Sequence, residues 1–180
     1  MIISRTPVRI TFLGGGTDYP NYYLKYGGET LGMAINKYSF ISVNNLHNTS
    51  DYSYKISYRK NESAKSLDEI EHPSVKACLD FLNIKNIEIK YSGSLPARTG
   101  LGSSSSFTVG LLNALYRLQG KKVPPIKLAE DAIYVEQKLI GEMVGCQDQY
   151  TCSIGGLQKI KYLKNGNVEA KPLNIGNEKI

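Results

Sequence analysis

Hydrophobic and polar residues alternate along several stretches of the chain, in the pattern of half-buried β-strands. The first such stretch begins at Ile2. Its core side would carry Val8, Ile10 and Phe12. Arg9 would then point away from the core. The same alternation predicts further strands at residues 29–35, 38–46, 52–58 and 84–91.

Apolar residues at helical spacing predict the helices, and proline or glycine marks their boundaries. The polar stretch at residues 61–71 has neither pattern and is expected to be a surface loop. Helices are expected from Pro20 to the glycines at 27–28, after Pro73, over the leucines at 111–118, and over residues 126–140.

Residues 94–108, which we call the glycine-serine segment, lie between a predicted strand and a predicted helix. Gly100 and Gly102 allow the backbone to adopt strained dihedral angles and to approach a ligand closely. The serines stand where the helix would begin, and a helix start offers unpaired amides and a positive dipole end to an anion. Serine hydroxyls can also ligate magnesium. A plain connector with one serine capping the helix is the alternative.

One acidic residue in the last predicted helix falls on its apolar side. On a helical wheel of ~100° per residue, Val135 and Leu139 lie in the apolar arc, and Glu136 projects from its middle. Asp131 lies on the polar side. Burying an unpaired carboxylate is costly, so Glu136 needs a partner. A salt bridge is one interpretation, and magnesium ligation is favoured because the helix that follows the glycine-serine segment is adjacent in sequence.

A second glycine-rich turn follows the first strand. It consists of Gly14, Gly15 and Gly16, with Thr17 and Asp18 directly after it. Three glycines let the main chain lie against a ligand, and the Asp18 carboxylate can accept hydrogen bonds from sugar hydroxyls. The alternative is a tight turn in which Thr17 or Asp18 caps the following helix. This stretch alone does not decide between them.

Asp148 lies in a stretch bracketed by glycines, residues 141–156. Close to a permanently charged arginine, an aspartate stays ionised and can accept a proton from an attacking hydroxyl. A turn residue without a chemical role is the alternative. The neighbouring Cys146 and Cys152 are interpreted as packing residues.

Two of these stretches resemble motifs of the GHMP kinase family of small-molecule kinases. Residues 96–106 resemble the central motif, P-x-x-x-G-L-G-S-S-A-A, with Ser105 and Ser106 in place of the alanines. Residues 5–20 resemble the amino-terminal motif of the sugar kinases. Galactokinases carry Gly-Glu-His-Thr-Asp-Tyr there, whereas the triple glycine of this chain resembles the heptose 7-phosphate kinases and the fucokinase branch. The loss of the Glu and His side chains argues against galactose as the substrate.

A third stretch, residues 145–149, resembles the family pattern Gly-x-x-Asp-Gln. Galactokinase-type members carry an acidic residue on a helix twelve positions before that aspartate, and Glu136 stands twelve positions before Asp148. The resemblance covers about residues 1–163. Because three motifs occur in the family's order, the resemblance is specific.

The resemblance implies an α+β fold with a mixed, mostly antiparallel sheet and helices on one side, a fold that the family shares with a ribosomal protein domain. It implies an ATP- and Mg²⁺-dependent kinase acting on the anomeric hydroxyl of a sugar phosphate, with D-glycero-D-manno-heptose 7-phosphate favoured. A fucokinase- or galactokinase-like enzyme, a non-catalytic sugar- or nucleotide-binding module and an RNA-binding module are the alternatives.

The family motifs also imply roles for individual residues. Asp148 would accept the proton of the attacking hydroxyl, and Arg9 would orient Asp148. Magnesium would be held by Ser104 and Glu136. The residues expected to bind ATP are Pro96, Gly100, Leu101, Gly102, Ser103, Ser104 and Ser105. Those expected to contact the sugar phosphate are Gly14, Gly15, Gly16, Thr17, Asp18 and Gln147.

Composition limits the class of protein further. The 180 residues, 41% hydrophobic and 21% charged, suit a globular domain. No apolar run approaches the ~20 residues of a membrane helix and no signal pattern opens the chain, so a cytoplasmic protein without a membrane partner is expected. Three cysteines and two histidines without metal-ligand spacing argue against a disulfide framework or a zinc site.

The net charge of +6 comes from 22 Lys and Arg against 16 Asp and Glu. The lysines are scattered along the chain. Tyr52, Tyr54 and Tyr58 share a strand face with Ile56, which is typical of sheet packing rather than of base stacking. No nucleic-acid partner is therefore expected.

The family continues into a second α/β domain, so residues 1–180 are expected to form only its amino-terminal, ATP-binding domain. A fragment and a natural short form both fit this expectation. Little kinase activity is expected from the chain alone. The sequence leaves open which sugar is phosphorylated and whether the protein forms a homodimer.

Overall fold

The computed structural model describes residues 1–46, 51–95 and 99–174. Its strands are β1 (Ile2–Leu13), β2 (Gly28–Asn45), β3 (Tyr54–Ser57), β4 (Asn61–Ala64), β5 (Ile87–Gly93), β6 (Leu157–Tyr162) and β7 (Val168–Pro172). They form one sheet in the order β4-β3-β5-β2-β6-β7, and β1 pairs with β2. All pairs are antiparallel except β3 with β5.

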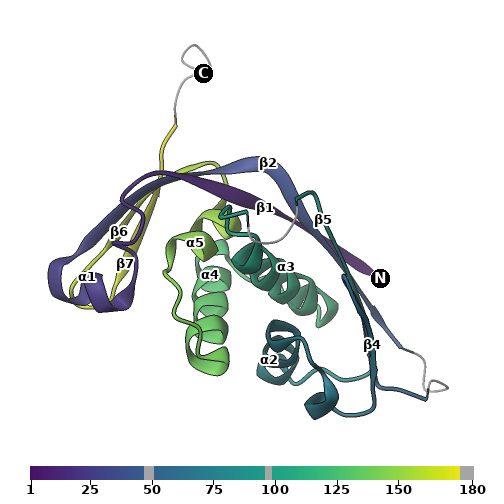
Figure 1. Ribbon diagram of the computed structural model, residues 1–180. Helices are drawn as coiled ribbons and strands as arrows, with labels where there is room; N and C mark the ends of the chain where they lie inside the picture. The colour runs from purple at the N-terminus through teal and green to yellow at the C-terminus, as the bar shows by residue number, and fades with distance from the viewer. Residues whose placement is uncertain (47–50, 96–98, 175–180) are drawn as a thin grey trace.

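The sheet arches over most of the helices (Figure 1). The helices are α1 (Pro20–Tyr26), α2 (Pro73–Leu82), α3 (Ser103–Leu118), α4 (Pro125–Tyr134) and α5 (Gln147–Ile154), with a 3₁₀ turn η1 (Leu67–Glu69) and a π turn η2 (Val135–Ile140). Pro20, Pro73 and Pro125 occupy first-turn positions, where the amide that proline lacks has no helical partner. Helix α3 lies against β1 and β2 and contacts α2, α4 and α5.

The main core lies between the sheet and helices α2, α3 and α4. Ile41 of β2 and Leu111 and Leu115 of α3 are completely buried in it. A smaller cluster that contains Tyr23 and Tyr162 packs α1 against β6. Because neighbours surround α3, its first turn has a defined position relative to β1.

The expected α+β fold class is confirmed. The sheet is mostly antiparallel, and helices α2–α5 lie on one side of it (Figure 1). Cys146 and Cys152 are buried and free, as their interpretation as packing residues requires. Among the described residues, no helix combines the length and the apolar character needed to cross a bilayer.

Strand β1 buries a different set of side chains from the one expected. Val8 is buried, but Phe12 is 51% exposed. In its place, Ser4 and Thr6 are almost completely buried. The Ser4 hydroxyl donates to the carbonyl of Gly110 in α3 at 2.8 Å. Helix α3 packs closely against β1 here, so the side chains between them are small and carry hydroxyl groups. Because these residues are polar, a search for alternating apolar residues does not identify this face of β1.

Arg9 contacts the helices instead of pointing away from them. Thr6 faces α3, and Arg9 and Thr11 contact α5. Strict alternation would send Thr6 and Arg9 to opposite faces of the sheet. The register of β1 against β2 shifts between Pro7 and Val8, where β2 has two extra residues, Asn36 and Lys37, and Arg9 follows directly after this irregularity.

Two strand predictions were also wrong in detail. Residues 28–45 form one continuous strand, β2, rather than two. Strand β4 lies within residues 61–71, where a loop was expected. The inward side chains of β4 are Glu62 and Ala64, and a buried glutamate hides the alternation that would reveal a strand.

The helix predicted over residues 126–140 changes into the π turn at Val135. Leu139, expected on the apolar side, is 43% exposed, because a wheel drawn for an α-helix does not describe a π turn. Asp131, expected on the polar side, is 3% exposed. Its carboxylate accepts hydrogen bonds from the Tyr116 hydroxyl at 2.8 Å and from Lys127 Nζ at 2.7 Å, which compensate for its burial.

Candidate active site

Residues 99–102 of the glycine-serine segment form a bend that leads into α3. Gly100 and Gly102 have φ angles of 74° and 71°, in the left-handed region that favours glycine. The first helical hydrogen bond runs from the amide of Ser106 to the carbonyl of Gly102, so the amides of residues 103–105 have no acceptor within the helix. This helix end therefore has the geometry of an anion site. Pro96, also expected to bind ATP, lies outside the described residues.

Arg9 of β1 holds this turn through its backbone and its side chain. Its amide donates to the carbonyl of Leu101 at 3.0 Å, and its Nη1 donates to the carbonyl of Gly100 at 2.8 Å. One residue thus fixes two successive carbonyls of the turn. The amides that begin α3 are positioned by the same contacts.

Arg9 also forms a two-point ion pair with Asp148. Nε donates to Oδ1 at 2.7 Å and Nη2 donates to Oδ2 at 2.9 Å, a geometry that fixes the orientation of the carboxylate. The two side chains are 14% and 21% exposed, so a ligand can still reach them. A Cβ atom at Gly102 would lie 2.9 Å from Asp148 Oδ2. The predicted pair therefore exists and lies directly against the start of α3.

Hydrogen bonds connect the first turn of α5 to β1 and to the residues that follow the Gly14–Gly16 turn. The Thr11 hydroxyl donates to Gln147 Oε1 at 2.8 Å, and the amide of Gln147 donates to Asp18 Oδ2 at 3.1 Å. A Cβ atom at Gly145 would lie 1.8 Å from the same Asp18 oxygen, so only glycine allows this close approach. These contacts determine where Asp148, the next residue of α5, is placed.

Asp18 is 1% exposed. Its carboxylate accepts hydrogen bonds from the Gly16 amide and from both the amide and the side chain of Gln147. The alternative that Thr17 or Asp18 caps α1 is wrong, because Tyr19 is the capping residue and no side chain caps that helix. Asp18 therefore links the glycine turn to α5, and its contact with a sugar stays a prediction.

The glycine turn itself combines a structural glycine with two open ones. At Gly14 a Cβ atom would lie 1.9 Å from the carbonyl oxygen of Glu29, and the Thr17 hydroxyl donates to the Gly14 carbonyl. Gly15 and Gly16 are exposed, and a Cβ atom there would meet nothing closer than 3.9 Å. Their backbone is thus accessible to a ligand. A role in sugar binding stays a prediction for this turn and for Gln147.

Glu136 reaches the first turn of α3 from the π turn. Its Oε2 accepts hydrogen bonds from the Ser105 hydroxyl at 2.9 Å and from Gln149 Nε2. Glu136 is 1% exposed, and burial raises the pKa of its carboxyl group despite these hydrogen bonds. No ion pair of Glu136 occurs within the described ranges, so the salt-bridge interpretation is not supported there.

The second carboxylate oxygen of Glu136, Oε1, has no hydrogen-bond partner among the residues that the structure describes. An unpaired, buried carboxylate oxygen near a phosphate site suits Mg²⁺, which prefers oxygen ligands. Ser104 is exposed in the same helical turn, whereas Ser105 is the serine that contacts Glu136, so a common ion on Ser104 and Glu136 stays a prediction. In the described part of the chain, no three His, Cys, Asp or Glu side chains are grouped to hold a metal. Phosphate and water oxygens would complete the shell.

The sequence assigned no role to two residues that help to build this site. Gln149 is completely buried between Ser105 and Glu136. The Gly-x-x-Asp-Gln pattern could have indicated Gln149, because a glutamine that is part of the motif directly after the aspartate suggests a supporting contact. Thr11 gave no such signal, since nothing in the alternation along the first strand indicates that its hydroxyl contacts Gln147 of α5.

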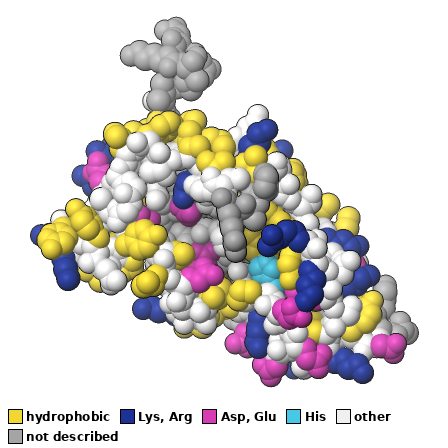
Figure 2. All heavy atoms as spheres, viewed as in Figure 1, with side chains coloured by type: hydrophobic (Ala, Val, Ile, Leu, Met, Phe, Trp, Pro, Cys, Tyr) yellow, Lys and Arg dark blue, Asp and Glu magenta, His cyan; other side chains and the backbone are white. Residues whose placement is uncertain are grey.

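On the face shown in Figure 2, a few acidic side chains lie near the middle and more lie toward the lower right. Free amides at the start of a helix, with two carboxylates from other helices beside them, are the arrangement expected of a phosphate-binding domain that also has groups for acid–base chemistry. Comparison with known proteins narrows this class. The family model for the GHMP kinases N terminal domain matches residues 65–156, and the chain belongs to the GHMP kinase family.

Curated relatives and solved structures agree with this assignment. The chain is 26% identical to D-glycero-alpha-D-manno-heptose 7-phosphate kinase of Campylobacter jejuni, over 98% of this chain and 55% of that protein. It is 29% identical to a galactokinase of Pyrococcus furiosus, over 90% and 46%. A crystal structure of a D-glycero-D-manno-heptose 1-phosphate kinase from Bacteriodes thetaiotaomicron has a TM-score of 0.89 at 26% identity, over 99% of this chain and 61% of that one. The chain spans about half the length of the curated relatives that it matches.

Proposed function

We propose that this chain is the ATP-binding domain of a sugar kinase, which transfers the γ-phosphoryl group of ATP to the anomeric hydroxyl of D-glycero-D-manno-heptose 7-phosphate. The observation that carries this proposal is the position of the Arg9–Asp148 pair against Gly102, where the free amides of α3 begin. Phosphoryl transfer depends mainly on positioning and on charge stabilisation, and this arrangement supports both.

Asp148 acts as the proton acceptor. The acceptor hydroxyl oxygen attacks the γ-phosphorus, the bond from that phosphorus to the β–γ bridging oxygen breaks, ADP leaves, and the hydroxyl proton passes to Asp148. Arg9 occupies one hydrogen-bonding position on each Asp148 oxygen, and each oxygen keeps further acceptor capacity for this proton. The guanidinium group also balances the negative charge at the reacting centre.

The amides of residues 103–105 bind phosphate oxygens at the positive end of α3. Glu136 would hold Mg²⁺ through Oε1, which has no hydrogen-bond partner among the described residues, with the Ser104 hydroxyl as a further ligand. The ion would supply positive charge against the β- and γ-phosphates. The Ser105 hydroxyl keeps Glu136 next to the helix end where those phosphates bind.

A heptose phosphate is favoured over galactose by the triple glycine and by the heptose kinase relative, which matches over 98% of this chain. The backbone of Gly15 and Gly16 is exposed, and Gly16 and Gln147 both donate to Asp18, which supports a sugar contact at this turn. A galactokinase-like activity is the second candidate, because a galactokinase of Pyrococcus furiosus is 29% identical over 90% of the chain.

The test is a substrate panel assayed with the complete natural polypeptide that carries this chain. ADP release is measured with heptose 7-phosphate, galactose, fucose and mevalonate, and ³¹P NMR locates the transferred group. The proposal predicts the highest kcat/KM for heptose 7-phosphate and a phosphate on the anomeric oxygen. A preference for galactose would establish the second candidate. Nucleotide binding without ADP release from any acceptor would indicate a binding module instead.

A further inference from the structure

Gln149 is a buried polar residue that the proposed reaction does not use. It is completely buried in α5, directly after Asp148. Its Nε2 donates to Glu136 Oε2 and to Ser105 Oγ, the latter at 3.2 Å. Its Oε1 has no partner among the residues that the structure describes. A buried amide with an unpaired oxygen lowers the free energy of unfolding, and the amide of Gln149, unlike other buried side-chain amides of the described residues, contacts both Ser105 and Glu136 of the candidate site.

We infer that Gln149 is a positioning residue, which holds the Glu136 carboxylate so that Oε1 remains free for the cation bound with ATP. This inference rests on the proposed kinase function. It assigns to Gln149 a contribution to the affinity for magnesium-bound nucleotide, made through Glu136 and not through direct contact with the nucleotide.

The first support is the distribution of donors on the carboxylate. Ser105 and Gln149 both donate to Oε2 of Glu136, whereas Oε1 has no hydrogen-bond partner among the described residues; the nearby Thr108 hydroxyl donates to the carbonyl of Ser104 instead, at 3.4 Å. Two donors on one oxygen fix the rotation of the carboxylate. Groups that orient a metal-binding carboxylate in this way affect metal affinity although they do not touch the metal.

The second support is the local backbone at Glu136. This residue is the second of the π turn that continues α4, and π turns occur frequently at functional sites. Ser105 belongs to α3 and Gln149 to α5, so the Gln149 amide directly links the three helices at this point. Because Asp148 precedes Gln149, the same amide also relates the position of the proton acceptor to that of the metal-binding acid.

The chain contains a matched control for this residue. Gln158 of β6 is 1% exposed, its Nε2 donates to the carbonyl of Gly155 at 2.6 Å, and its Oε1 is unpaired among the described residues. It lies in a different part of the fold, paired with β2 through Gly32. Replacing Gln158 therefore removes the same buried group without changing the surroundings of Glu136.

The experiment measures binding of the non-hydrolysable ATP analogue AMPPNP by calorimetry, once with MgCl₂ and once with EDTA, on the full chain. Gln149→Leu is expected to weaken binding in MgCl₂ by about 10–100-fold, the range typical of groups that orient a metal ligand, and to leave binding in EDTA unchanged. Gln158→Leu is expected to change neither affinity. Thermal unfolding establishes that each variant is folded, and Gln149→Met, which keeps the length of the side chain, replaces a leucine variant that does not fold.

A double mutant separates this inference from the function on which it rests. In the Glu136→Gln background, adding Gln149→Leu should cause no further loss, because both changes act through one carboxylate. Equal losses in MgCl₂ and EDTA, or an unchanged magnesium dependence in Gln149→Leu, would overturn the role of Gln149 and leave the kinase proposal standing. Failure of the unmodified chain to bind AMPPNP, or binding without any magnesium dependence, would overturn both.

Discussion

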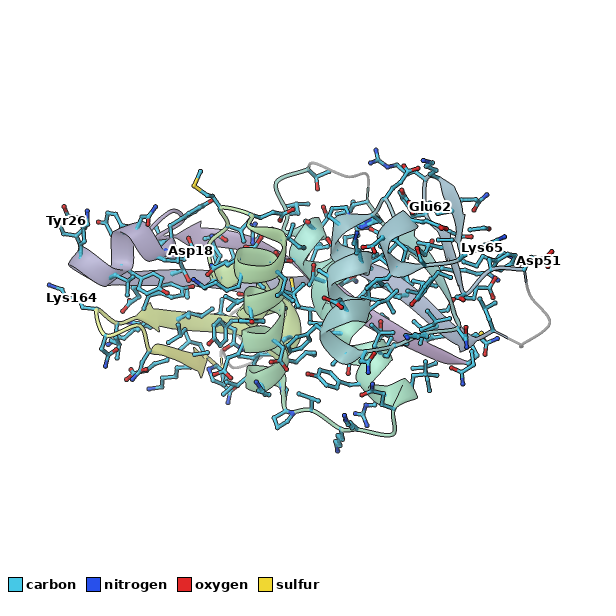
Figure 3. All side chains as sticks on the ribbon, turned by 90° about the horizontal axis from the view of Figure 1, so that it is seen from below. Asp18, Tyr26, Asp51, Glu62, Lys65 and Lys164 are labelled. Carbon is cyan, nitrogen blue, oxygen red and sulfur yellow. The ribbon has the colours of Figure 1, made fainter. Side chains whose placement is uncertain are left out.

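Two buried glutamates in this fold have opposite surroundings. Glu62 on β4 is 7% exposed, and its two oxygens accept hydrogen bonds from the Tyr58 hydroxyl and the Glu71 amide. Glu136 is 1% exposed and keeps one oxygen unpaired among the described residues. Figure 3 shows Glu62 and Asp18 in opposite halves of the molecule. Glu62 accepts hydrogen bonds from Tyr58 and Glu71, whereas Glu136 accepts them from Ser105 of α3 and Gln149 of α5. The two carboxylates therefore have different sets of partners.

The pKa values of the two carboxyl groups shift in opposite directions. Burial raises both, but the hydrogen bonds to Glu62 from Tyr58 and the Glu71 amide outweigh it and bring its pKa below the ordinary value of 4.5. The Tyr58 hydroxyl in turn has its pKa raised to about 12, chiefly by that hydrogen bond. For Glu136 burial prevails, and its pKa stays raised. Burial alone thus does not distinguish the two acids, whereas the Glu136 oxygen that has no partner among the described residues does.

The largest effect is expected for Asp148→Asn, which tests whether the α3 end carries the chemistry. Loss of the proton acceptor should reduce turnover by about 10²–10⁴-fold, because general-base catalysis contributes that much. AMPPNP affinity should be nearly unchanged. Steady-state ADP release and calorimetry measure the two quantities, with Asp80→Asn on the surface of α2 as the control. Turnover within a few-fold of the unmodified protein would mean that another group accepts the proton.

Glu136→Gln should weaken magnesium-dependent nucleotide binding without lowering stability. The affinity for AMPPNP in MgCl₂ should fall by at least the ~10–100-fold typical of changes around a metal ligand. The free energy of unfolding at pH 7 should stay the same or rise, because a raised pKa means that the folded state disfavours the charged form. Urea denaturation measures this. A clear loss of stability would show that Glu136 is structural, like Glu62, and would remove the contrast.

Gly102→Ala tests the contact between the helix start and the catalytic pair. Its φ angle is 71°, and a Cβ atom would lie 2.9 Å from Asp148 Oδ2 and 3.2 Å from Arg9 Cγ. Displacing these groups should reduce kcat by about 10–100-fold, as small misplacements in active sites do. Gly120→Ala is the matched control, since its φ angle is 75° and a Cβ atom there meets nothing within 4 Å. Equal kinetics in the two variants would contradict the proposed importance of this contact.

The smallest effect is expected for Glu62→Gln, which should change stability without changing turnover. Removing a hydrogen-bonded carboxylate should lower the free energy of unfolding at pH 7 by about 1–3 kcal/mol. Because the pKa of Glu62 is lowered in the folded state, its stabilisation is complete above pH 4.5 and is lost as the pH falls through the folded-state pKa. The difference between the variant and the unmodified chain, measured by urea denaturation, should therefore shrink at low pH. A difference that does not depend on pH would show that the Glu62 charge is not what stabilises β4.

Much of the fold could be predicted from the sequence because local signals agree with tertiary structure. Helix α1 begins at Pro20 and ends before Gly27, as the proline and glycine indicated. Predictions failed where packing overrides the local pattern. Ser4 and Thr6 are buried because α3 lies close to β1, and Glu62 is buried because Tyr58 and Glu71 donate to it. Neither partner can be identified from the pattern around the buried residue itself.

The candidate site could be predicted where a sequence motif implies the relative positions of its residues. Gly102, Asp148 and Arg9 lie together as the spacing and the resemblance implied. The role of Gln149 depends on three helices meeting at one point, and the sequence indicates it only indirectly, through the Gly-x-x-Asp-Gln pattern. The side-chain contact of Arg9 with α5 arises from the assembled structure and is not indicated by the alternation along β1.

The most direct measurement follows backbone amide NMR signals as Mg²⁺ and AMPPNP are added to the labelled chain. If the start of α3 binds the nucleotide's phosphates, the amides of residues 103–105 should show the largest shifts, and residues around Glu136 should follow only when Mg²⁺ is present. Signals around Glu62 should stay in place. Shifts centred on the Glu62 region, with residues 103–105 unchanged, would contradict the assignment of the anion site to this helix end.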